Sequence, residues 1–73
     1  MKQLQTLLIN DNAIIKRIIN KGTITQRFID LGIEEGASIK LLLVSPSKRM
    51  KAYYIKGSLI AIRDCDASSI LVE

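Results

Sequence analysis

The chain contains no histidine, and it has one cysteine, one proline and three aromatic residues among its 73 positions. Without histidine, a dedicated transition-metal site, a histidine-based catalytic triad and a histidine pH switch all lose their usual ligand or base. A single cysteine, Cys65, excludes an intramolecular disulfide and a multi-cysteine zinc site, so nothing indicates an oxidising compartment. We expect a small, partly buried thiol at Cys65, no metal site and no cofactor.

Long apolar segments are also lacking. The longest uninterrupted apolar runs span four residues, and Met1–Gln5 carries a charge without a long apolar region behind it. Neither a signal peptide nor a transmembrane helix fits this pattern. We therefore expect a cytoplasmic protein that does not insert into a membrane.

Motifs for chemistry are missing as well. The glycines follow neither a phosphate-loop nor a dinucleotide-binding fingerprint; they are Gly22, Gly32, Gly36 and Gly57. Asp64 and Asp66 lie two apart in a predicted helical turn, where their side chains diverge, and Glu34-Glu35 belongs to a turn. The serines have no histidine or nucleophile-elbow motif beside them. We therefore predict that the protein is not an enzyme.

The composition is that of one folded domain covering residues 1–73. Hydrophobic residues make up 48% of the chain and charged residues 25%, which excludes disorder. A chain this short is near the lower size at which an apolar core alone holds a fold.

Short apolar segments separated by turn residues predict a mainly β protein. An apolar lead-in at residues 4–9 and an Asn10-Asp11-Asn12 turn precede the first long strand. The other predicted segments follow, with a two-residue Gly57-Ser58 hairpin turn and a helical turn that Asp64 caps: the strands are 13–19, 38–44, 50–56, 59–63 and 70–72, and the turn is 64–68. In strand 38–44 we expect Ile39, Leu41 and Leu43 on one face. This order indicates a small, partly open antiparallel β-barrel of the SH3 type.

One short α-helix is predicted after the first long strand, which Asn20-Lys21-Gly22 ends. Thr23 and Gln26 have the spacing of a capping box at its start. Ile24, Phe28 and Leu31 lie on one helical face, so Phe28 and Leu31 are the expected core anchors.

The end of this helix is marked by Gly32. This glycine stands where a left-handed C-cap residue is needed, and Ile33 beyond it can fold back onto the helix. Gly36 then closes the turn before strand 38–44. Gly32, Gly36, Gly57 and Phe28 are therefore predicted to be structural residues.

The net charge of +4 raises the question of nucleic acid, because clustered lysines and arginines release counterions from phosphate. The densest basic stretch contains Lys48, Arg49, Lys51 and Lys56, with Tyr53 and Tyr54 between them. We favour a solvated hairpin whose lysines protect a strand edge, because no aromatic repeat or recognition helix accompanies the charges. No nucleic-acid partner is expected, and a small RNA-binding module is kept as an alternative.

Segments 27–36, 57–63 and 70–73, with Pro46 between the first two and Ala67 before the last, give the chain a resemblance to the FeoA family of SH3-like proteins. The first segment reads Arg-Phe-Ile-Asp-Leu-Gly-Ile-Glu-Glu-Gly. The resemblance implies a cytoplasmic, non-catalytic accessory role in bacterial ferrous iron transport, through contact with the membrane permease FeoB. It leaves room for weak contact with a transition metal, although no ligand cluster is seen.

The candidate contact residues are drawn from the helix, its exit turn and the basic hairpin. They are Arg27, Leu31, Ile33, Lys48, Arg49 and Lys51. A regulatory module like the C-terminal domain of iron-dependent repressors is a further alternative, and self-association is left open.

Overall fold

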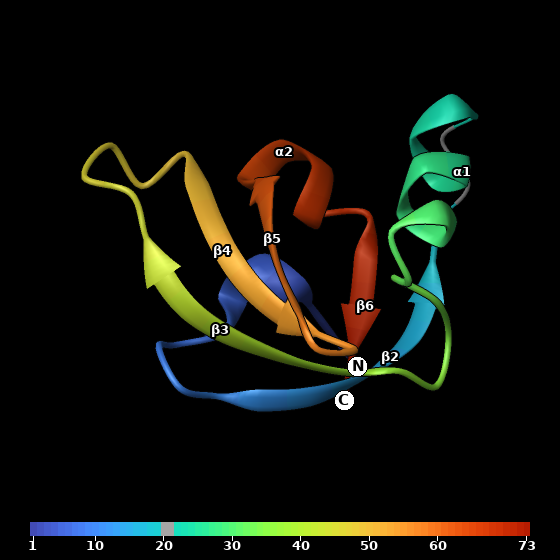
Figure 1. The fold of residues 1–73 in the computed structure, drawn as a ribbon, viewed down its shortest axis with the longest axis horizontal. Coiled ribbons are helices and arrows are strands. Elements are labelled where there is room, and N and C mark those ends of the chain that lie inside the picture. Colours follow the sequence, from blue (N-terminus) through green and yellow to red (C-terminus); the bar gives the residue numbers. More distant parts are fainter. Residues whose placement is uncertain (20–21) are drawn as a thin grey trace.

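The computed structural model describes residues 1–19 and 22–73, without the side chains of residues 23–25, and the predicted break at Asn20-Lys21 lies outside this part. Within it, strands predominate and helices are short (Figure 1). The elements in order are β1 (Lys2–Gln3), the 3-10 helix η1 (Leu4–Thr6), β2 (Asn12–Ile18), α1 (Thr23–Asp30), β3 (Ser38–Val44), β4 (Met50–Ile55), β5 (Ser58–Arg63), α2 (Asp64–Ala67) and β6 (Ile70–Val72).

The strands form one antiparallel sheet in the order β1-β6-β2-β3-β4-β5. Strand β2 joins its two halves, because Asn12–Ile14 pair with β3 and Ile15–Ile18 pair with β6. Strands β1 and β5 are the two ends and are not paired with each other, and α2 contacts both β5 and η1. The predicted mainly β, partly open SH3-like architecture is confirmed.

Strand β3 contains an irregularity that the alternating pattern does not reveal. Leu41 pairs with Tyr53 and Leu43 with Ala52, so Leu42 is an extra residue opposite β4. Such a bulge reverses the alternation that follows it. The prediction that Leu43 lies with Ile39 and Leu41 is wrong: Leu43 is 59% exposed, and Val44 packs on the core instead.

The hairpin between β4 and β5 turns one residue earlier than predicted. Ile55 pairs with Ser58, so the two turn residues are Lys56 and Gly57, and both have positive φ, +49° and +81°. Two positive φ angles are what a type I′ hairpin turn requires. Lys56 thus has a positive φ angle, which glycine and asparagine adopt more readily than lysine does. In the first turn the residue with a positive φ angle is an asparagine, Asn10, at +73°.

Helix α1 ends as the sequence predicts, with Gly32 at φ +90°. The Ile33 N–H donates to the Phe28 carbonyl at 2.8 Å and the Gly32 N–H to the Ile29 carbonyl at 2.9 Å. These two bonds make a Schellman motif, which folds Ile33 back over Phe28. Both side chains belong to the core cluster.

The helix starts differ from prediction. Gly22 occupies the N-cap of α1, and the Gln26 amide donates to Asp30 Oδ1 at 3.0 Å. The Thr23 side chain of the predicted capping box lies outside the described part. At α2 the N-cap is Arg63, which has no side-chain cap bond, and Asp64 is the first helical residue. Cys65 is exposed, not partly buried, because it points out of this single turn.

The core lies inside the curved sheet and is closed by η1, α1 and α2. Its members are Leu4, Leu7, Ala13, Ile15, Phe28, Ile33, Ala37, Ile39, Leu41, Tyr53, Ile55, Ile62, Ala67, Ile70 and Val72. Every element except β1 contributes at least one of them. Helix α1 and the β3–β4 loop lie at opposite ends of the view in Figure 1.

Candidate functional site

A groove runs between α1 and the β4–β5–α2 segment, and two of the predicted contact residues line it. Arg27 and Leu31 stand one helical turn apart on the same side of α1, and both are exposed. The groove has a volume of about 320 Å³. We call it the α1 groove; its lining residues are Arg27, Phe28, Leu31, Met50, Ala61, Ile62, Arg63 and Asp66.

Each wall of the α1 groove carries an arginine, and the two arginines differ in whether the guanidinium is paired. Arg63 Nε donates to Asp66 Oδ2 at 3.0 Å, and this hydrogen bond raises the pKa of the Arg63 guanidinium. Within the described part of the chain, Arg27 has neither an ion-pair nor a hydrogen-bond partner for its guanidinium. The groove therefore presents one unpaired positive charge beside an apolar floor of Phe28 and Ile62.

Leu31 has a different role from the one its helical spacing suggests. Its side chain is 49% exposed, whereas Phe28 is 6% exposed. The expectation that Leu31 anchors the core is therefore wrong, and only Phe28 does so. Leu31 sits at the C-cap, where the chain leaves the helix and the apolar face is completed by Ile33 instead.

Ile33 is unsuitable as a contact residue. Its side chain is fully buried, because the Schellman motif directs it inward. Reaching a partner would require opening the cap and the core together. The assignment of Ile33 to the docking surface is thus corrected.

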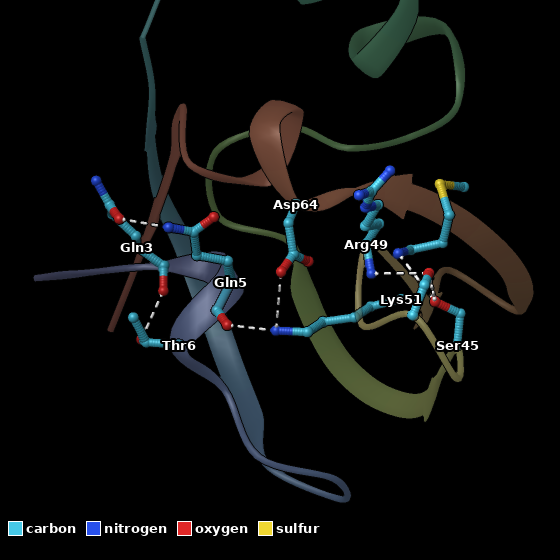
Figure 2. Close-up of polar contacts among 9 residues, drawn as sticks. Gln3, Gln5, Thr6, Ser45, Arg49, Lys51 and Asp64 are labelled. Atoms are coloured by element: carbon cyan, nitrogen blue, oxygen red, sulfur yellow. Dashed lines mark hydrogen bonds and ion pairs between the residues drawn. The ribbon is translucent and has the colours of Figure 1, made fainter.

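Lys51 is also turned inward, although it belongs to the basic hairpin. Its ammonium donates to the Gln5 carbonyl at 2.6 Å and lies 3.6 Å from Asp64 Oδ2, as Figure 2 shows. Only 13% of the Lys51 side chain is exposed, against 33% for Asp64. Lys51 ties β4 to η1 and to the start of α2, so its prediction as a contact residue is corrected.

Tyr53, which the nucleic-acid alternative requires as a stacking platform, lies in the core. It is fully buried, and its hydroxyl has no hydrogen-bond partner among the described residues. Burial, together with the nearby Asp64 carboxylate, raises the pKa of Tyr53 to about 12. Tyr54 remains exposed on β4, but one aromatic ring does not form a stacking surface.

Lys48 and Arg49 remain as exposed cations in the β3–β4 loop. Lys48 has φ +63°, and the Met50 N–H donates to Ser45 Oγ, which helps to hold the loop (Figure 2). A second hollow of about 580 Å³ runs along this loop and shares Met50 and Arg63 with the α1 groove. The structure therefore connects the loop cations to the side of the α1 groove opposite Arg27.

The far wall of the groove could not be identified from the sequence. Met50, Ala61, Arg63 and Asp66 come from β4, β5 and α2, which are distant from α1 along the chain. Nothing in their local pattern separates them from other strand and helix residues. Only the antiparallel pairing of Met50 with Arg63 places them together.

The glycines predicted to be structural all have positive φ. Gly36 has φ +90° and lies in the turn before β3, where its N–H donates to the Ile15 carbonyl at 2.7 Å. A β-carbon at Gly32 would lie 3.3 Å from Lys56 Cδ, so the exit of α1 is close to the β4–β5 turn. Lys56 pairs with Glu34 across this approach.

The described residues contain no group of three or more histidine, cysteine or acidic side chains able to hold a metal ion. No helix in the same part of the chain has the length and apolarity needed to cross a membrane. The described features of the site are those of a binding surface: a groove, a strand edge and unpaired cations.

Comparisons with known proteins give matches in sequence family and in fold. The FeoA domain model matches residues 2–73. No curated protein sequence matches the chain. The iron(II) transport protein A of Clostridium thermocellum is similar at 27% identity with a TM-score of 0.93, over 97% of this chain and 44% of that one.

Two further solved structures are similar in fold alone. One is a Stenotrophomonas maltophilia FeoA with zinc, described as a prokaryotic SH3 domain protein and a suggested activating factor of ferrous iron transport. It is 17% identical, with a TM-score of 0.87, and the match covers 100% of this chain and 91% of that one. The other is a manganese-dependent transcriptional repressor, 20% identical with a TM-score of 0.90, over 99% of this chain and 35% of that one.

Proposed function

The chain belongs to the FeoA domain family, and we propose that it is a non-catalytic cytoplasmic accessory protein of ferrous iron transport that docks on a FeoB-type permease. Ferrous iron is the cargo of that system, and the proposal requires no iron bound to this chain. Docking uses the α1 groove and its rim, with Arg27 and Leu31 as the contacts on α1.

One observation carries the proposal: Arg27 is exposed and unpaired in the described structure, and Leu31 is exposed one turn away beside a groove whose floor is apolar. Arginine beside an exposed apolar side chain is typical of the residues that dominate protein interfaces. Arg49 and Lys48 extend the same surface past Met50 and Arg63. A cationic rim of this kind also accelerates association with an acidic partner.

A binding measurement with the cytoplasmic part of the permease tests this. We expect Arg27→Glu and Leu31→Asp each to weaken binding by roughly tenfold or more, as loss of a central contact does. Arg17→Glu is the matched control, because Arg17 is an exposed arginine on β2 outside the groove and the charge change is the same. Circular dichroism must show that all three variants stay folded.

Wild-type affinity in both groove variants would refute docking through α1. If Arg17→Glu weakens permease binding equally, the change in net charge alone explains the effect of Arg27→Glu. If the wild-type chain does not bind the permease at all, the proposed partner is wrong.

A further inference from the structure

Strand β5 is an open edge of the sheet. It is the last strand in the order, and in the described structure its backbone hydrogen bonds run to β4 alone. Ser58, Leu59, Ala61 and Arg63 are exposed, and the strand contains neither lysine nor proline. Natural proteins usually protect exposed edges with those residues or with bulges. Arg63 is the one charged residue of β5, and an unpaired edge whose first five residues carry no charge is suited to receiving another strand.

The α1 groove meets the C-terminal half of this edge, at residues 61–63. Ala61, Ile62 and Arg63 are consecutive, and all three line it. Consecutive residues of a strand point to opposite faces, so a groove that touches three in a row reaches the backbone of β5, and Met50 on β4 extends the same groove onto the face of the sheet. The opposite wall is α1, with Arg27 and Leu31 facing the same space.

We propose that the α1 groove binds an extended acidic peptide segment as an added strand on β5, with the face of the segment that carries its acidic side chains toward Arg27 on α1. This deepens the proposed function and rests on it for the identity of the partner, in which such a segment would be found. The acidic preference follows from the unpaired Arg27 guanidinium and from the chain's net charge of +4. A segment of about six residues matches β5, which spans about 20 Å.

A proline-rich ligand fits the groove less well. Polyproline segments dock into grooves lined by aromatic side chains. The one aromatic residue of the α1 groove is Phe28, which is only 6% exposed, and Tyr53 is buried in the core. A proline at alternate positions would also remove N–H donors that an added strand needs.

The first test is a titration with a synthetic peptide, fluorescently labelled acetyl-Glu-Val-Glu-Val-Glu-Val-Glu-amide, followed by anisotropy at low salt. We expect saturable binding that Arg27→Glu weakens about tenfold and Arg17→Glu changes by less than about twofold, because Arg27 lines the groove and Arg17 does not. The peptide with lysine in place of glutamate should not bind. Equal effects of the two arginine variants, or equal binding of the lysine peptide, would overturn the proposal.

The second test separates strand addition from charge attraction alone. Two versions of the peptide carry N-methyl groups on either all glutamates or all valines, so each loses the N–H groups along one edge. An added strand uses only one of its edges against β5, so one version should keep its affinity and the other should lose about tenfold or more. Equal affinity of the two versions, whether both are kept or both lost, would refute strand addition.

The two proposals fail in different ways. If the permease binds and Arg27→Glu weakens it while the peptides do not bind, the docking surface stands and strand addition is wrong. If the acidic peptide binds but the permease does not, the groove is a peptide site and the proposed partner is wrong.

Discussion

Replacing Lys51 with methionine should destabilise the fold by about 2–4 kcal/mol. Methionine preserves most of the buried aliphatic stem but removes the ammonium that bonds the Gln5 carbonyl at 2.6 Å and faces Asp64 Oδ2 at 3.6 Å. A hydrogen bond from a charged donor contributes about 1.5–3 kcal/mol, and a half-buried carboxylate left unpaired adds to the loss. Asp64 Oδ1 already lacks a partner in the described structure, so this carboxylate has little other support.

The chain offers a matched control in the Lys16–Glu73 pair. Its N···O distance is also 3.6 Å, but 46% and 64% of the two side chains are exposed. Exposed ion pairs contribute about 0–1 kcal/mol, so Lys16→Met should have little effect. The difference between the two variants measures the combined effect of burial and of the Gln5 hydrogen bond at the same ion-pair distance.

Urea unfolding followed by circular dichroism measures both variants, and a cycle with Asp64→Asn measures the coupling. We expect the Lys51→Met/Asp64→Asn double variant to be at least about 1 kcal/mol more stable than the sum of single losses predicts, because neutralising Asp64 relieves its unpaired charge. Equal stability of Lys51→Met and Lys16→Met would refute the reasoning. A coupling energy near zero would show that Lys51 acts through Gln5 alone.

Other perturbations test other parts of the fold and the docking surface. Gly32→Val should cost about 1–3 kcal/mol, because a β-branched residue at φ +90° is strained, and an unchanged urea midpoint would contradict the cap. The pKa of Tyr53 is about 12 in the folded protein against an ordinary value of 10 in the unfolded chain. The stability that the neutral Tyr53 hydroxyl contributes is therefore intact below pH 10 and is lost as pH rises toward 12. At pH 11 the wild type should therefore have lost stability, on the order of 1 kcal/mol, relative to Tyr53→Phe, measured by urea unfolding across pH. Met50→Glu, opposite α1, should weaken permease binding without lowering the thermal midpoint, since Met50 is only partly buried at the groove wall.

Local sequence signals predicted the elements that depend on local physics. The helix ends at Gly32 because a glycine four residues after Phe28 can take positive φ and return Ile33 to the core. The observed bounds of strand 38–44 agree with the prediction, because a short, mainly apolar segment between two turns favours a strand. Such signals involve residues a few positions apart, so the sequence displays them directly.

The errors concern relations between distant segments. Leu43 points outward because a bulge opposite β4 inserts one residue into β3, and a bulge is a property of the pair of strands. Lys51 points inward because a backbone carbonyl of η1 and a carboxylate of α2 meet it there. The charge of Lys51 predicts that it lies on the surface, because most lysines in folded proteins are exposed.

The same reasoning explains why only half of the α1 groove was found. Arg27 and Leu31 are four residues apart on one helix, so helical geometry alone places them on one side. The opposite wall exists because β4 and β5 pair with Met50 across from Arg63, and because β5 has no further neighbour in the described sheet. The apolar and cationic half of the site could therefore be read from spacing, whereas the strand edge that makes it a groove follows only from the order of the strands. If docking uses the cations alone, variants in the far wall will bind normally; if it uses the edge, Met50→Glu and Arg27→Glu will weaken the same complex.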